Sequence, residues 1–232
     1  MMVGEGMPVA PAGGDAPGTL EGAIRARFRA PRAAAVAGIV FSCLFMVSLV
    51  LVWRSVPADP LETGEWLSRD TKTLRLALNL VPFSGIAFLW FMAVLRDRFG
   101  ADGDRFFDTV FLGSGFLFVA MLFSCVAVAV ALVVAHGMAP DRLAESGTYA
   151  FGRIMAYQIM RIFAMKMAGV FMILTSKLSL RAGIVPRWTA FLGFSLALAL
   201  LLAPDRIQWL PLIFPLWILL MSIQMLRKPV KP

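Results

Sequence analysis

Long apolar stretches recur along the chain, and they constrain its fold more than any other feature of the sequence. Six of them lie at residues 33–53, 76–95, 109–135, 154–176, 188–203 and 209–226. An α-helix rises about 1.5 Å per residue, so about 20 apolar residues cross the hydrocarbon core of a bilayer. A helix also satisfies its own backbone hydrogen bonds, which lipid cannot do. The sequence therefore predicts an all-α, polytopic membrane protein with a bundle of six transmembrane helices.

The amino-acid composition agrees with this class and leaves little room for a soluble domain. The chain is 59% hydrophobic and 16% charged, whereas soluble domains carry roughly a quarter charged residues. The six apolar stretches and the short segments between them use most of the 232 residues. We therefore expect one transmembrane domain over residues 33–232, preceded by two N-terminal segments.

The two N-terminal segments differ in composition. Residues 1–18 are rich in Gly, Pro and Ala and contain almost nothing to bury, which predicts a disordered cytoplasmic tail. Over residues 19–32, Leu20, Ile24 and Phe28 recur every four positions, and arginines occupy other positions. That pattern is typical of a basic amphipathic juxtamembrane helix on an anionic leaflet. A charged flank that only orients the first span is the alternative.

Lys and Arg are distributed unequally between the two sides of the predicted spans. If the N-terminus is cytoplasmic, the inner segments contain nearly twice as many of them as the outer segments. The inner ones are concentrated at residues 25–32, 96–105, 177–187 and 227–231. The positive-inside rule therefore predicts that both termini are cytoplasmic (N-in/C-in). Much of the net charge of +8 is explained by this orientation, so it does not imply a nucleic-acid partner.

Two cations, Arg161 and Lys166, lie inside the apolar stretch 154–176. A cation at the centre of a transmembrane helix costs at least ~2.5–3.5 kcal/mol, and such residues usually face the interior of a bundle, a partner or a wet cavity. On a helical wheel, Lys166 lies roughly 140° away from Arg161. Arg161 shares one broad face with Tyr157, Gln158, Met165, Ala168, Met172, Thr175 and Ser176. This helix is therefore the leading candidate for function.

One interpretation is a polar cavity around Arg161 that binds an anionic or amphipathic ligand or a lipid headgroup, since the guanidinium is always charged. Its candidate ligand-binding residues are Arg161, Tyr157, Gln158, Lys166, Asn79 and Ser84. The last two belong to the stretch 76–95, in which Pro82 removes a backbone hydrogen bond and can kink the helix. Alternatively, their amide and hydroxyl groups bond to their own helix or to a neighbour.

The other interpretation of the two cations is structural. Arg161 would donate hydrogen bonds to helix-end carbonyls or to a loop carboxylate and so tie helices together. Lys166 would turn toward an interface or contact another subunit. Both interpretations stay open from the sequence alone.

Several kinds of chemistry find no residues in the sequence. His136 is the only histidine, so paired axial histidines for haem and HExxH-type zinc sites are absent. Cys43 and Cys125 lie in apolar stretches, where cysteines are commonly small buried side chains. No carboxylate falls inside a predicted span, which removes the usual acid of a proton-coupled carrier. We therefore predict no catalytic residue, no metal site and no cofactor.

The segments LVPFSGIAFLWFMAVLRDRFG (80–100), DRFFDTVFLGSGFLFVAMLF (104–123) and RIMAYQIMRIFAMKMAGVFMILTS (153–176) carry a family resemblance. They resemble small six-helix inner-membrane proteins of bacteria that have no assigned activity. The resemblance covers most of the chain beyond Leu76. It implies a six-helix fold and a multi-pass location in the bacterial plasma membrane, and it supplies no catalytic or ligand-binding residue.

Two classes of function follow from these observations. The sequence predicts a non-enzymatic binding or transport-like protein, and the alternative is an accessory or assembly subunit that packs on a larger membrane protein complex. Ala34, Gly38 and Ser42 form a stripe of small residues that would let a neighbouring helix approach closely. A complex would bury this stripe or Lys166 against another chain, whereas a carrier would have a polar cavity within one bundle.

Overall fold

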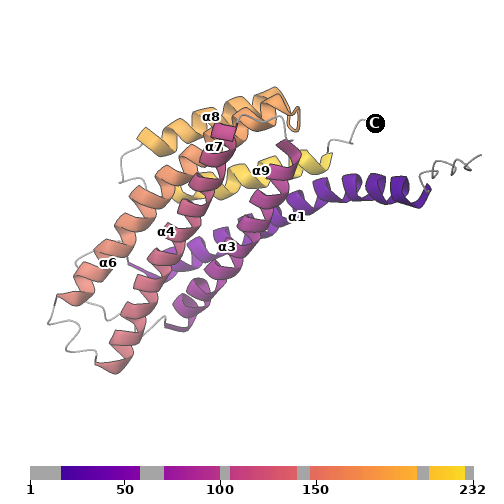
Figure 1. Ribbon diagram of the computed structural model, residues 1–232. Helices are drawn as coiled ribbons and strands as arrows, with labels where there is room; N and C mark the ends of the chain where they lie inside the picture. Colours follow the sequence, from indigo (N-terminus) through magenta and orange to yellow (C-terminus); the bar gives the residue numbers. More distant parts are fainter. Residues whose placement is uncertain (1–16, 58–70, 100–104, 140–146, 203–208, 228–232) are drawn as a thin grey trace, which may run out of the picture.

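The computed structural model describes residues 17–57, 71–99, 105–139, 147–202 and 209–227, and within its helices the side chains of 17–32 and of Arg105 are not described. Every secondary-structure element in these ranges is helical (Figure 1). The elements are α1 (Pro17–Ser55), α3 (Thr71–Phe99), α4 (Arg105–Met138), α6 (Thr148–Gln158), the π-helix η1 (Ile159–Ala164), α7 (Met165–Arg181), α8 (Arg187–Leu202), the 3₁₀ turn η2 (Leu210–Leu212) and α9 (Ile213–Arg227). The all-α prediction is therefore confirmed for this part of the chain.

Five helical stretches are long and apolar enough to cross a membrane. They are Ala33–Ser55, Thr71–Phe99, Phe106–Met138, Thr148–Arg181 and Leu210–Arg227. Helix α8 has 16 residues and is about 24 Å long, shorter than a hydrocarbon core of about 30 Å. The chain is thus a multi-pass membrane protein with five spans of full length, and the sixth span and the N-in/C-in orientation stay predictions.

Helix α1 runs unbroken from Pro17 to Ser55. The segment 19–32 is therefore helical and continuous with the first span, although its location on a membrane surface stays a prediction. Residues 1–16, most of the predicted tail, lie outside the described ranges.

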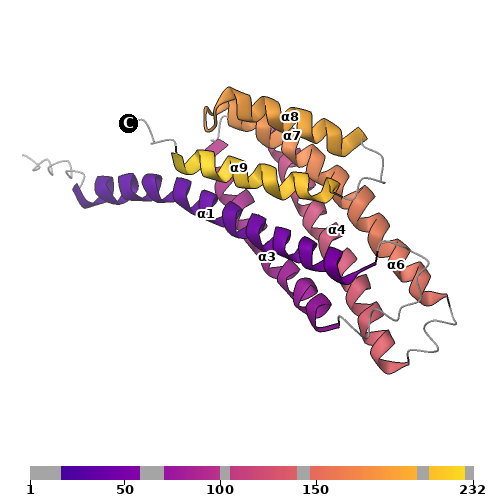
Figure 2. The ribbon, with the colours of Figure 1, turned by 180° about the vertical axis from the view of Figure 1, so that it is seen from behind.

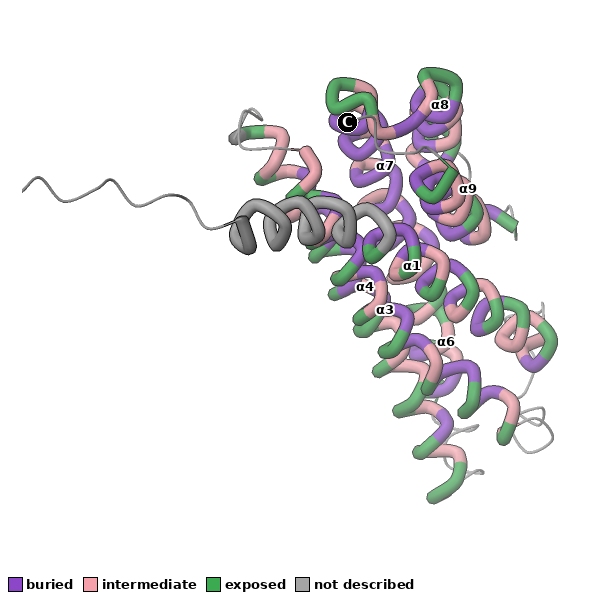
Figure 3. The backbone as a smooth tube through the Cα atoms, turned by 90° about the vertical axis from the view of Figure 1, so that its right-hand side faces the viewer, coloured by how far each residue is buried: buried purple, intermediate pink, exposed green. Residues whose placement is uncertain are grey.

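The helices form a ring around one apolar core. Helix α1 packs on α3 and α9, α4 packs between α3 and the α6–η1–α7 helix, and α8 packs on α7 and α9 (Figures 1 and 2). In both views α4 and α6 lie side by side at the end of the bundle opposite α8. Buried positions recur along each helix, with exposed ones on its other side (Figure 3).

Phenylalanine rings from five helices fill the centre of this ring. Phe88 lies 5.0 Å from Phe41 and 5.0 Å from Phe171, and Phe118 lies 4.7 Å from Phe214, all between ring centroids. All five rings are fully buried. Aromatic pairs at such distances contribute about 0.5–1.5 kcal/mol each beyond the area they bury. Because lipid is as apolar as a side chain, close packing of this kind holds membrane helices together.

The stripe of small residues on α1 is used inside the chain. Ala34, Gly38 and Ser42 are buried, and a Cβ added at Gly38 would collide with the Ser222 hydroxyl of α9 and lie 2.9 Å from a ring carbon of Phe91. The stripe therefore brings α9 and α3 close to α1, and it offers no free surface to another chain.

A smaller apolar cluster holds the other end of the bundle. Leu74 and Leu78 of α3, Val133 of α4 and Tyr149 of α6 are buried together. The guanidinium of Arg153 donates to the hydroxyl of Tyr149 at 3.4 Å and to the carbonyl of Pro57 after α1. Arg153 thus ties α6 to the end of the first span.

Candidate functional site

Arg161 lies in the π-helical segment that joins α6 to α7. It is buried, with 8% of its surface exposed, and its Cζ lies 4.7 Å from the ring centroid of Tyr157. A guanidinium over an aromatic face gains about 0.5–2 kcal/mol of cation–π energy, more when it is desolvated. Short π segments inside α-helices are frequent at functional sites because they re-aim side chains.

The face predicted around Arg161 does not form one cavity wall. Tyr157 is about half exposed and Gln158 is exposed. On the other side of the π segment, Met165 and Met172 are completely buried in the central core. The π turn rotates the faces of α6 relative to those of α7. As a result, the part of the predicted face on α7 lies in the core, and the part on α6 lies at the surface.

Lys166 has a partner within the chain. Its Nζ donates to the carbonyl of Leu201 at 2.8 Å. Leu201 is the penultimate residue of α8, whose last carbonyls have no acceptor role within the helix itself. A cation at a helix C-terminus is also favoured by the helix dipole. Lys166 therefore caps the end of the short helix α8.

The two predicted ligand-binding residues of α3, Ser84 and Asn79, make other contacts and do not line a common pocket with Arg161. Ser84 is buried, and its hydroxyl donates to the carbonyl of Val81 in its own helix at 2.7 Å. Asn79 is exposed and lines a small pocket of about 150 Å³ with Arg75, which is also exposed. The structure thus brings Asn79 together with Arg75, which was not among the predicted ligand-binding residues.

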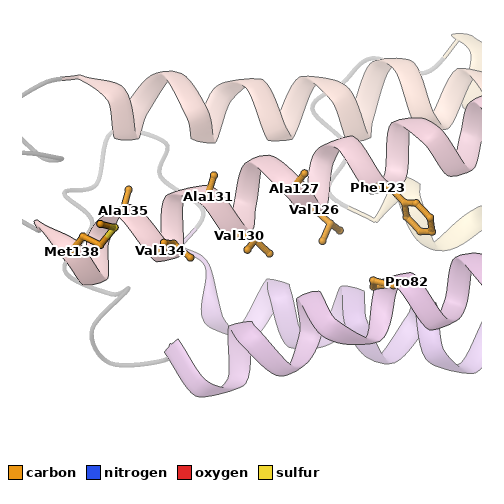
Figure 4. A pocket seen from close by; sticks show the side chains of 9 residues that line it. All are labelled: Pro82, Phe123, Val126, Ala127, Val130, Ala131, Val134, Ala135 and Met138. Carbon is orange, nitrogen blue, oxygen red and sulfur yellow. The ribbon is translucent and has the colours of Figure 1, made fainter.

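A larger apolar groove lies between α3 and α4 (Figure 4). It has a volume of about 610 Å³ and is lined by Pro82, Phe123, Val126, Ala127, Val130, Ala131, Val134, Ala135 and Met138. Figure 4 shows the three valines of α4 on the side that faces α3, its alanines Ala127, Ala131 and Ala135 on the opposite side, and Pro82 of α3 near Phe123. The groove is lined almost entirely by hydrocarbon.

Close contact between the two helices bounds this groove on one side. A Cβ added at Gly85 of α3 would lie 2.5 Å from the ring of Phe123 on α4. The glycine therefore lets the Phe123 ring pack directly on the α3 backbone, one turn from Pro82. Beyond this contact the lining residues of α4 are mostly valines and alanines, whose side chains are smaller than a phenylalanine ring and leave the groove open.

The apolar groove and the small pocket are neighbours along α4. Val130 and Val134 line both of them. Arg75 and Asn79 stand one helical turn apart on α3, so their side chains share one face of that helix. The two pockets therefore lie side by side, one of hydrocarbon at Phe123 and Pro82 and the other with a guanidinium and a carboxamide, and together they are called the elongated site. Neither part of this site is lined by Arg161.

The sequence contains one signal for the polar end of this site. Arg75 precedes Asn79 by one turn, at the margin of the second apolar stretch. Polar residues so spaced on one helix form a joint polar patch. The facing wall on α4 could not be found in the same way, because α4 is apolar around its whole circumference.

Other reactive side chains in the described ranges are isolated. These ranges contain no group of three or more His, Cys, Asp or Glu residues that could hold a metal ion. Cys43 and Cys125 are both free, and the Cys125 thiol donates to the carbonyl of Ala156 on α6 at 3.3 Å. Cys125 therefore has a packing role between α4 and α6.

Comparison with known proteins adds no family to this description. No protein-family model, curated protein or solved structure matches the chain.

Proposed function

We propose that this protein is a non-enzymatic, multi-pass membrane protein that binds an anionic amphipathic molecule in the elongated site between α3 and α4. The observation that carries the proposal is that the apolar groove adjoins the pocket of Arg75 and Asn79, with Val130 and Val134 lining both. The resemblance in the sequence adds the bacterial plasma membrane as its proposed location.

The chemistry of the site matches the two ends of such a ligand. A groove of about 610 Å³ falls in the range of small-molecule sites, which are mostly apolar with a few placed polar groups. The hydrocarbon wall accepts an apolar chain. Arg75 presents a planar guanidinium that binds carboxylate or phosphate through two parallel hydrogen bonds, and Asn79 adds an amide donor.

Arg161 is not part of the proposed α3–α4 site. Its guanidinium already lies over the Tyr157 ring, and it lines neither part of the α3–α4 site. Binding of an anionic ligand at Arg161, with Tyr157 and Gln158, stays a prediction that its own variants test below.

The alternative of an accessory subunit has less support. The two features proposed for contact with another chain were the small stripe of α1 and Lys166. Gly38 in that stripe lies against Ser222 and Phe91, and Lys166 bonds to Leu201. Since both are engaged within the chain, the open site between α3 and α4 favours a binding protein.

Native mass spectrometry in neutral detergent tests the proposal with two anionic probes, a phosphatidylglycerol and a free long-chain fatty acid, and with phosphatidylcholine as the neutral comparison. We expect the anionic probes to be retained at least about tenfold more than phosphatidylcholine, since a charge-assisted pair contributes about 1.5–3 kcal/mol. Retention of the phospholipid alone would identify a membrane lipid as the ligand, and retention of the fatty acid alone a free amphiphile.

Matched variants locate this binding. Arg75→Gln should reduce anionic retention to the level of phosphatidylcholine, while Lys72→Gln, an exposed cation one turn earlier on α3 that lines neither pocket, should leave it unchanged. Val130→Trp should fill the groove and reduce retention of every probe, and Leu117→Trp at an exposed position of α4 outside the groove is its control. Equal retention in the Arg75 and Lys72 variants would contradict the proposal.

A further inference from the structure

Helices α7, α8 and α9 meet at a junction that contains polar side chains without partners. The hydroxyls of Ser176 and Ser179 on α7 and of Thr189 on α8, and the indole N–H of Trp217 on α9, have no hydrogen-bond partner among the described residues. Ser176, Ser179 and Thr189 are fully buried, and Trp217 is 1% exposed. A buried polar group without a partner is uncommon and calls for an unseen one, most often a water molecule.

Two of these polar atoms, on Ser176 and Trp217, lie at one spot. A Cβ added at Gly193 of α8 would collide with the Ser176 hydroxyl and would lie 2.7 Å from Nε1 of Trp217. Both groups therefore lie against the backbone of Gly193, where no side chain separates the three helices. Thr189 stands one turn from Gly193 on α8, and Ser179 stands one turn from Ser176 on the facing side of α7.

Other serines in the helices behave differently. Five of them donate their hydroxyl to a carbonyl three or four residues earlier in the same helix: Ser42, Ser84, Ser114, Ser124 and Ser195. That local bond is the usual way in which a helical serine is satisfied in lipid. Ser176 and Ser179 do not make it, so their hydroxyls are left to face the junction.

The chemistry of the junction selects a neutral occupant. Hydroxyls both donate and accept hydrogen bonds, and the indole N–H donates. None of these four groups is charged, so neither an ion nor an anionic headgroup finds a counter-charge among them. Water makes two to four hydrogen bonds to such groups and is held at buried sites of this kind.

We propose that the α7–α8–α9 junction is a hydration site, in which buried water molecules bridge Ser176, Ser179, Thr189 and the Trp217 indole. Ser179 lies within one turn of Arg181, Ala182 and Gly183, which are exposed at the turn between α7 and α8. The water therefore exchanges with the solvent at that end of the bundle. Helix α8 is held on α7 by the Lys166 bond at its C-terminal end and by bridging water near its N-terminal end.

Thiol accessibility tests the hydration directly. In a background with Cys43→Ala and Cys125→Ala, we compare Thr189→Cys with Ala190→Cys, two fully buried neighbours at the same depth of α8. A small, positively charged methanethiosulfonate should modify Thr189→Cys at least about tenfold faster, because the thiolate that reacts forms only where water solvates it. Equal slow rates at the two positions would overturn the proposal.

The sign of a stability change gives an independent reading. If water bridges the junction, Ser176→Ala and Thr189→Val remove its partners and should lower the melting temperature. If the junction is dry, the same changes remove groups without partners and should raise it. Ser222→Ala is the matched control, because that hydroxyl is also buried without a partner among the described residues but lies at another place, against Gly38 and the Phe91 ring. A rise in melting temperature for all three variants would show a dry junction.

Discussion

The two cations of the α6–η1–α7 helix are stabilised by different kinds of partner. Arg161 is buried with its guanidinium over the Tyr157 ring, and Lys166 donates to the carbonyl of Leu201. A planar guanidinium stacks on an aromatic face, whereas an ammonium acts as a compact donor to a single acceptor. Each residue type therefore suits the partner it has, and exchanging Arg for Lys at either position is not conservative.

Arg161 is expected to tolerate removal better than conservative replacement. Arg161→Met removes a buried charge together with its demand for solvation, which can be neutral or stabilising. Arg161→Lys keeps the charge and loses the planar stack, so we expect a lower melting temperature than for the Met variant. Thermal unfolding in detergent measures both. Unfolding of the Met variant with unchanged ligand retention would show instead that Arg161 ties the helices together.

Lys166 is expected to show the opposite order. Lys166→Met leaves the Leu201 carbonyl without its donor at the end of α8, a loss of about 1–3 kcal/mol. Lys166→Arg keeps a donor within reach and should recover part of that loss. Lys72→Met, which removes an exposed cation of α3, is the control and should change the unfolding free energy by less than about 0.5 kcal/mol. Equal stability of Lys166→Met and Lys72→Met would mean that the cap contributes nothing.

For single residues, the sequence showed which charged side chains lie inside a span, but it did not show their hydrogen-bond partners. The cost of a charge in lipid singled out Arg161 and Lys166 from their positions alone. Their partners depend on which helices are neighbours, so the pairing of Lys166 with Leu201 of α8 could not be derived. Arg75 gave no comparable signal, because an arginine at the end of a span can reach the interface with its long side chain and its charge is then not costly.

The π segment is the element that the sequence did not reveal. A helical wheel with one constant period predicted a single face from Tyr157 to Ser176. Residues Ile159–Ala164 instead form a π-helix, which contains one more residue than an α-helical turn and so shifts the faces on its two sides. The wheel was right for α7 alone, where Met165, Met172 and Ser176 are all buried.

Deleting one residue of the π segment tests its role as an inserted turn. Phe163 lies in the segment and is 54% exposed, so its deletion should restore a continuous α-helix while α6 and α7 keep their neighbours. Deletion of Val170 in α7 is the control, because it rotates one part of a regular helix about 100° relative to the other. We expect the Phe163 deletion to fold and to lose only a few degrees in melting temperature. Comparable loss of folded protein in both variants would contradict this.

Helix α8 shows what length alone predicts. Its apolar stretch was predicted to be the sixth span, and with 16 residues it is shorter than the five long helices, so that span stays a prediction. Near its C-terminal end, the carbonyl of Leu201 accepts a hydrogen bond from Lys166 of the neighbouring helix α7. Lys166, whose charge is costly to place in its own transmembrane helix, thus stabilises the end of another helix.

On the scale of the whole molecule, the order of the helices in the ring was beyond reach of the sequence. Hydropathy predicted helical spans because each must hide its backbone from lipid. It carries no information on neighbours when α4 and α8 are apolar on all sides, so the placement of α4 between α3 and α7 is new information. The elongated site exists only through that placement, since its two walls belong to different helices.

Orientation decides which leaflet reaches this site, and it can be measured. The excess of Lys and Arg at residues 25–32, 96–105, 177–187 and 227–231 predicts that both termini are cytoplasmic. Ser68→Cys should then lie outside and Ala101→Cys inside. In a background with Cys43→Ala and Cys125→Ala, a membrane-impermeant maleimide should label Ser68→Cys in intact cells and Ala101→Cys only after permeabilisation. This result would place Arg75, at the same end of α3 as residue 71, at the outer leaflet, so that an anionic amphiphile enters from outside. The reverse labelling would overturn the orientation and turn the polar end of the site toward the cytoplasm.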